Sequence, residues 1–116
     1  MPRTAPFRLP AAPARADLVV TYFRGLGHPT RLRILELLRE EGELSVGELV
    51  ERLGIGQTKV SNHLACLRWC GFVAARRQHR TVYNRVADER VAQMVDLAHA
   101  LLEDNEEHMA ACRIDG

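Results

Sequence analysis

The sequence has few aromatic residues, few cysteines and no long apolar run. Aromatic side chains make up only 5% of the 116 residues, which disfavours an aromatic-rich β-sandwich, whereas apolar residues make up 47%. The three cysteines are an odd number without framework spacing, which disfavours a disulfide-stapled secreted module and favours a reducing cytoplasm. There is no run of about 18 apolar residues, so no transmembrane helix is expected. Residues 1–17 also lack the continuous apolar segment of a secretory signal. A single cytoplasmic domain packed mainly by leucine, valine and alanine, with no membrane partner, fits this composition.

Acidic residues are absent from one long stretch of the chain. The formal net charge is only +1, but residues 52–87 contain six arginines, one lysine and no Asp or Glu. The flanking residues 36–51 and 88–116 are both strongly acidic. A basic stretch of this kind is typical of a face that binds nucleic acid, and the plainer alternative is a solvated basic surface.

The chain divides into an arm, a folded domain and a tail. Residues 1–15 are rich in Pro, Ala and Arg and are predicted to form a disordered basic arm, residues 16–104 the domain, and residues 105–116 a flexible tail. Apolar periodicity predicts helices at 17–27, 29–41, 45–53, 57–71 and from 88 to about 104. Strands are expected at 72–75 and 81–86, joined by a basic tip at 76–80. This mainly α order with a small β-hairpin wing predicts a winged helix-turn-helix.

Local signals support three of these boundaries. Ser45 and Glu48 have the spacing of a capping box, which opens a helix. Gly54 stands where a tight turn between two helices needs a positive φ, and Gly71 is placed to end the helix before the wing.

The predicted helix 57–71 would lie in the major groove of DNA. Its buried stripe is Val60, Leu64 and Leu67, and Thr58 and Asn62 lie nearly opposite that stripe. The candidate DNA contacts on this helix are Gln57, Thr58, Lys59, Ser61, Asn62 and His63. Those at the tip of the wing are Arg76, Arg77, His79 and Arg80, which would reach phosphates or the minor groove. A capped, solvated helix and a charged turn that prevents edge aggregation are the alternatives.

The same helix carries a pair of cysteines. Cys66 and Cys70 are four residues apart, so they are neighbours on one helix face with Cβ atoms about 5–6 Å apart, and thiolates prefer soft metal ions. Two small, partly buried hydrophobic residues are the alternative. Cys112 in the predicted tail is a candidate third ligand that would complete a trigonal sulfur site.

A second candidate metal site lies along the last helix. Asp96, His99 and Glu103 have spacings that place them on one side, and His108 follows, so that the four could bind an ion such as zinc. An acidic solvated face is the plainer interpretation.

Three stretches, residues 26–38, 44–73 and 76–86, resemble the ArsR/SmtB family of metal-sensing winged-helix repressors. The resemblance implies a homodimer formed through the first and last helices. It also implies an operator with an inverted repeat and release of double-stranded DNA when metal binds. Residues 43–49, ELSVGEL, lack the cysteine pair of the arsenic-sensing branch.

The pattern HLxCLxxCG places Cys66 and Cys70 closest to the cadmium- and lead-sensing, CmtR-like branch of that family. Cys112 matches the C-terminal cysteine of this branch, and the resemblance implies that it comes from the partner subunit. The predicted function is therefore a repressor induced by Cd(II) or Pb(II), with Zn(II) as a further candidate.

In two alternative interpretations the protein still binds DNA but senses a different signal. One is thiol oxidation or persulfide formation at the cysteine pair, although a disulfide between residues four apart would distort the helix. The other is Zn, Ni or Co bound through the last helix. An enzyme is not expected, because no nucleophile–base pair and no phosphate-cradling glycine loop occur, and no organic cofactor is implied.

Overall fold

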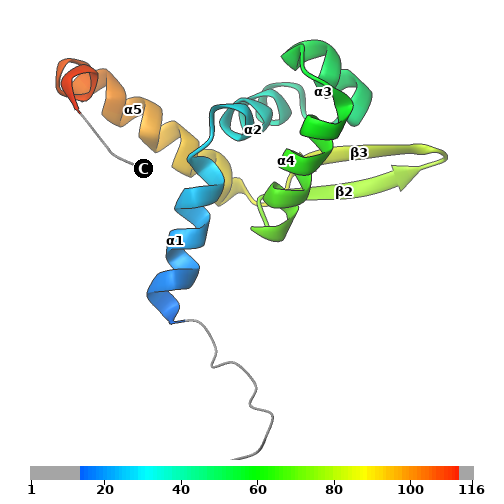
Figure 1. Cartoon of the computed structure of the whole chain (residues 1–116), viewed down its shortest axis with the longest axis horizontal. Helices are drawn as coiled ribbons and strands as arrows, with labels where there is room; N and C mark the ends of the chain where they lie inside the picture. Colours follow the sequence, from blue (N-terminus) through cyan, green and yellow to red (C-terminus); the bar gives the residue numbers. More distant parts are fainter. Residues whose placement is uncertain (1–13, 113–116) are drawn as a thin grey trace, which may run out of the picture.

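The computed structural model describes residues 14–112, so residues 1–13 of the predicted arm lie outside it. The elements in chain order are α1 (Arg15–Leu26), α2 (Pro29–Glu41), β1 (Leu44–Ser45), α3 (Val46–Leu53), α4 (Gln57–Trp69), β2 (Val73–Gln78), β3 (Thr81–Val86) and α5 (Glu89–Ala111). Helices α2, α3 and α4 form the body, and the β2–β3 hairpin projects from it (Figure 1). The predicted winged helix-turn-helix fold is confirmed.

The predicted capping signals fix both ends of the helix-turn-helix. The Ser45 side chain accepts a hydrogen bond from the Glu48 amide, and the Glu48 carboxylate accepts one from the Ser45 amide, which is a complete capping box. At the far end, Gly71 has a φ of 76°. This conformation lets the Phe72 amide donate to the carbonyl of Leu67 at 2.9 Å, which closes helix α4 and directs the chain into the wing.

The wing is longer than the sequence predicted. Strand β2 pairs with β3 from Val73 opposite Val86 to Gln78 opposite Thr81, so the turn consists of His79 and Arg80 alone. The predicted five-residue tip is therefore wrong: cross-strand pairing continues through Arg76 and Arg77, and His79 takes the positive φ of 57° that a tight hairpin turn needs.

A two-residue strand, β1, was missed by the sequence analysis. It pairs with β3 and gives a three-stranded antiparallel sheet in the order β1-β3-β2. Asn84, which is fully buried, donates a hydrogen bond to the Leu44 carbonyl and so joins the wing to the loop after α2.

The core lies between α2, α3, α4 and the base of the sheet. The predicted stripe on α4 is confirmed, since Val60, Leu64 and Leu67 are all 0% exposed. They pack with a cluster of buried residues that includes Ile34, Leu35, Leu38, Leu49, Phe72 and Val73. The apolar side of α4 is thereby fixed to the body, and its opposite side faces solvent.

Helix α5 continues beyond the predicted boundary at residue 104. It runs to Ala111, and only Asn105 departs from helical geometry, with φ −125° and ψ 21°. Residues 105–111 are thus helical rather than an irregular tail, because Glu, Met and Ala are strong helix formers. Its outer half extends from the body on the side away from the wing (Figure 1). None of the described helices is long and apolar enough to span a membrane.

Candidate DNA-binding face and sulfur site

The first turns of α4 present polar side chains to solvent. Gln57, Thr58, Lys59 and Asn62 are exposed, and Ser61 is half-buried. Because the buried stripe fixes the opposite side of the helix, these groups are held outward on a rigid element. They match the polar groups that read base edges and phosphates in a major groove.

His63 departs from the predicted exposed set. It is half-buried, and its ring lies 4.5 Å from the ring of His28, which caps α2 by accepting a hydrogen bond from Thr30. Burial lowers the pKa of His63, and the nearby positive charges of His28, Arg31 and Lys59 lower it further. His63 therefore faces α2, and its predicted DNA contact would require it to turn.

Of the four predicted contacts on the wing, three are freely exposed and one is paired, and Arg85 of β3 is a further exposed basic residue. Arg77, His79 and Arg80 are exposed. Arg76, in contrast, donates to both carboxylate oxygens of Glu43 at 2.8–3.0 Å, and its guanidinium lies 5.0 Å from the ring of Tyr83. The hydrogen bonds from Arg76 hold the pKa of Glu43 below its ordinary value, although burial opposes this effect.

Replacing Glu43 with glutamine is expected to strengthen DNA binding several-fold, because it removes an acid beside the wing and releases Arg76. The slope of log DNA affinity against log salt concentration should steepen by about one unit, because about one more counterion is released. Fluorescence anisotropy of a labelled duplex at several salt concentrations measures both quantities. The matched control is Glu106→Gln on the outer half of α5, and equal slopes for the two variants would contradict the assignment.

The two cysteines of α4 lie together at the C-terminal end of the helix. Both are half-buried, which is the burial that the alternative interpretation as two small hydrophobic residues predicted. Burial raises the pKa of the Cys70 thiol, the adjacent Cys66 raises it further, and Arg31 opposes the increase. The Cys70 sulfur lies 3.9 Å from the Thr21 carbonyl oxygen of α1. The pair is a compact soft-donor group, and the raised pKa of Cys70 means that a metal ion must displace the proton of this thiol to bind it.

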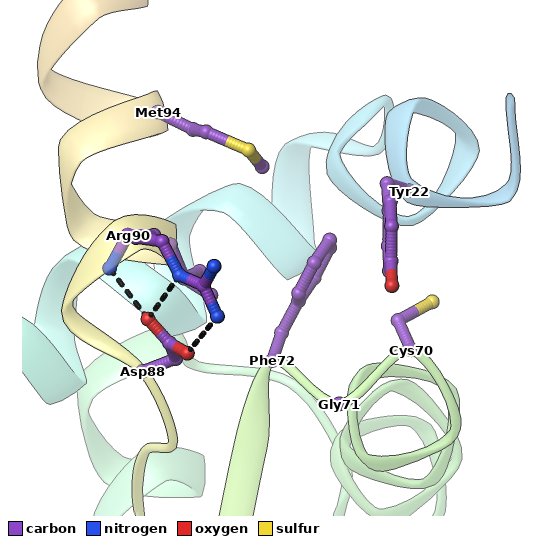
Figure 2. Close-up of a pocket in the computed structure, with 8 residues that line it drawn as sticks. Tyr22, Cys70, Gly71, Phe72, Asp88, Arg90 and Met94 are labelled. Carbon is purple, nitrogen blue, oxygen red and sulfur yellow. Dashed lines mark hydrogen bonds and ion pairs between the residues drawn. The ribbon is translucent and has the colours of Figure 1, made fainter. Parts of the chain in front are cut away.

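A cavity of about 280 Å³ opens beside Cys70. Figure 2 shows Phe72 between Tyr22 and Cys70 on one side and Met94 and Arg90 on the other. Asp88, the N-cap of α5, is held by Arg90 at the wall of this cavity, and the hydrogen bonds from Arg90 lower the pKa of Asp88 to about 2. Cys70 therefore has open space beside it, whereas Cys66 does not line this cavity.

Cys112 does not join the pair within one chain. It is exposed at the end of α5, and Figure 1 places the end of α5 far from α4. Between residues 14 and 112, no three His, Cys, Asp or Glu side chains lie close enough together to bind a metal ion. The predicted third ligand could therefore reach Cys66 and Cys70 only from another subunit.

The candidate ligands on α5 are not brought together either. Asp96 is paired with Arg39 of α2, and the His99 ring nitrogen lies 2.7 Å from the Glu36 carboxylate. Glu103 and His108 are exposed further along the helix. The ion pair between Arg39 and Asp96 opposes metal binding at Asp96, so the four residues do not form a metal site within this chain.

The sequence analysis missed the residues that surround the sulfur pair from other helices. Thr21 and Gly25 of α1 and Arg31 of α2 all lie beside Cys70. They are about 40 residues away in the sequence, and no local pattern links them to the cysteines.

A recognition helix with an exposed polar start, packed on a helix-turn-helix and followed by a basic wing, defines a winged helix-turn-helix DNA-binding regulator. Comparison with known proteins agrees with this class. The family described as "Bacterial regulatory protein, arsR family" matches residues 28–75. The chain is also 44% identical over 101 residues to the probable mercury resistance operon repressor of Streptomyces lividans. The aligned region covers 86% of this chain and 80% of that protein. The chain belongs to the ArsR family, whose members are transcriptional regulators and not enzymes.

Other similar proteins have names that point to different roles or to no particular role. The biofilm growth-associated repressor of Agrobacterium fabrum is 36% identical over 87% of this chain and 86% of its own length. The regulator CmtR of Mycobacterium tuberculosis is 44% identical over 60% of this chain and 58% of its own length. A homodimeric winged helix-turn-helix domain from Mycobacterium bovis, solved in solution, superposes with a TM-score of 0.73 at 33% identity, over 80% of this chain and 85% of that one. Family membership therefore fixes the DNA-binding class and leaves the inducer open.

Proposed function

We propose that the chain is a cytoplasmic, homodimeric repressor that binds operator DNA with an inverted repeat and releases it when Cd(II) or Pb(II) binds thiolates. The ligands are Cys66 and Cys70 of one subunit and Cys112 of the other. The observation that carries this proposal is the position of the cysteine pair on α4, the helix whose first turns present the base-reading side chains. Occupation of the pair acts directly on the element that contacts DNA.

Unpartnered apolar surface on α1 and α5 supports the homodimer. The exposed apolar residues are Leu18, Val19, Val20, Tyr22 and Phe23 on α1 and Leu97, Leu101, Leu102 and Met109 on α5. Monomeric proteins rarely leave such patches in water, and a second copy of the same chain would cover them symmetrically. Because Cys112 follows directly after this surface on α5, a dimer formed through it would carry Cys112 toward the partner.

The exposed basic residues of the wing are expected to contribute to DNA affinity without sequence preference. Arg77→Ala/Arg80→Ala should weaken binding to matched and scrambled duplexes alike and reduce the salt slope by about two counterions. Asn62→Ala should instead reduce the preference for the matched duplex, because its amide is placed to read a base edge. If the double arginine variant binds with an unchanged salt slope, the wing does not contact phosphate.

Hg(II) is a second candidate inducer. Within the described residues only two cysteines come together, and a soft ion that accepts two thiolates would need no third ligand. The similarity to a mercury resistance operon repressor over most of the chain points in the same direction. The two candidates differ in their need for Cys112.

Gel-shift titrations test the proposal. A duplex that the protein selects from a random-sequence library is incubated with the metal-free protein, and Cd(II), Pb(II), Hg(II) or Zn(II) is then added. Release by Cd(II) or Pb(II) at stoichiometric metal supports the proposal, release by Hg(II) alone supports the second candidate, and release by none of them contradicts both.

A further inference from the structure

Helix α1 packs against Cys70 at Gly25, where a larger residue would force its neighbours to shift. Gly25 is the one buried residue among those described in α1. A Cβ atom at this position would lie 3.0 Å from the Cys70 sulfur and 3.2 Å from the Phe72 ring. Real contacts of this kind are seldom so short, so α1 packs against Cys70 as closely as a backbone allows.

Arg31 of α2 holds the end of α1 in the same place. Its Nε donates to the Gly25 carbonyl at 2.8 Å and its Nη2 to the Arg24 carbonyl at 3.0 Å. These carbonyls belong to the last turn of α1, where a positive charge is favourable, and the Arg24 carbonyl also accepts a hydrogen bond from the Gly27 amide at 3.2 Å.

The remaining contacts of α1 with its own subunit lie around the same point. The Tyr22 ring packs on Phe72 with centroids 5.5 Å apart (Figure 2). The Cys70 thiol faces the Thr21 carbonyl. Leu26 at the end of α1 also packs against the core, whereas Leu18, Val19, Val20 and Phe23 are 43–66% exposed. The position of α1 on the body therefore depends strongly on where the Cys70 side chain lies.

We propose that α1 is the element that transmits occupation of the sulfur site, and that Gly25 and Arg31 are the positioning residues of this coupling. The inference rests on the proposed function, because it takes Cys70 to be a ligand. A Cys70 sulfur that shares an ion with Cys66 leaves its packed position between Thr21 and Gly25, and α1 loses the contact on which it is docked. Since α1 also carries apolar surface assigned to the partner, its displacement reaches the second subunit. The docked arrangement has high DNA affinity and the displaced arrangement has high metal affinity.

The test is Gly25→Ala in the full chain, with Gly47→Ala as the matched control. Gly47 is also helical, and its added Cβ would meet only the Ser45 side chain, at 3.9 Å. Gly25→Ala is expected to displace α1 without metal, so that metal-free DNA affinity falls on the order of tenfold and Cd(II) affinity rises. A purely structural defect would instead lower both affinities. Anisotropy of the selected duplex and thiolate-to-Cd(II) ultraviolet absorbance measure the two quantities.

Arg31→Lys provides a second variant that adds no bulk and keeps the positive charge. It should shift both affinities in the same directions as Gly25→Ala, to a smaller extent, and thermal melting confirms that each variant is folded. If the wild type releases DNA on Cd(II) and both variants match the Gly47→Ala protein, α1 does not carry the coupling. If the wild type itself does not release DNA, it is the proposed function that fails.

Discussion

Replacing Cys66 and Cys70 together with serine is expected to abolish Cd(II)-driven release of DNA, while the metal-free variant still binds DNA. Serine is close to cysteine in size, but its hydroxyl is a hard donor that stays protonated, so it cannot replace a thiolate on a soft ion. Removing a group that hydrogen-bonds to a metal ligand lowers metal affinity by up to about a hundredfold. Removing the ligands themselves should lower it further. Both side chains lie beside the buried stripe of α4 rather than in it, so the fold should tolerate the change.

A mixture of two inactive variants tests whether Cys112 acts across the dimer. The C66S/C70S chain retains Cys112, and the C112S chain retains the pair on α4. A mixed dimer contains one complete site only if the ligands come from different subunits. In an equimolar co-refolded mixture about half of the dimers are mixed, so about a quarter of the wild-type Cd(II) absorbance should return. Release of DNA by Cd(II) from the C66S/C70S protein alone would show that the sulfur pair is not the sensor. A C112S protein that responds to Hg(II) as the wild type does would favour the two-thiolate alternative.

The second large effect is expected at Leu64, which is 0% exposed and anchors α4 in the core. Leu64→Ala should lower the free energy of unfolding by about 2–5 kcal/mol, since it removes buried methyl groups and leaves a cavity. Domains of this size have a total stability of about 5–15 kcal/mol, so the loss is a large fraction of the whole. Urea denaturation followed by circular dichroism measures the change, at a fixed chain concentration because dimerisation adds to the apparent stability.

Asn62→Ala is the matched comparison on the same helix. Asn62 is exposed on the opposite side, so its replacement should leave the free energy of unfolding within about 0.5 kcal/mol of the wild-type value. Its effect should appear in DNA sequence preference alone. Equal destabilisation by the two variants would mean that the buried and exposed sides of α4 are wrongly assigned.

The parts of the fold that depend on local signals were predictable from sequence. The capping box at Ser45, the helix end at Gly71 and the buried stripe of α4 each follow from a few neighbouring residues, and the structure has all three. The errors lie where distant residues decide. The wing is longer because β2 continues to pair with β3, and β1 forms only because β3 is present to receive it.

The candidate sites divide in the same way. The adjacency of Cys66 and Cys70 is a property of one helix and was predictable. The pairing of Arg76 with Glu43 and of Asp96 with Arg39 joins segments far apart in sequence, so it could not be foreseen and changes what each group is free to bind. The contact of Gly25 with Cys70 is of the same kind.

The central claim is a coupling between metal and DNA, and it is tested most directly by measuring Cd(II) affinity with and without saturating duplex. Linkage requires DNA to weaken Cd(II) binding by the same factor by which Cd(II) weakens DNA binding, typically about 5–150-fold. The account predicts this equal and reciprocal loss. A Cd(II) affinity that is the same for the free protein and for the DNA complex would contradict it.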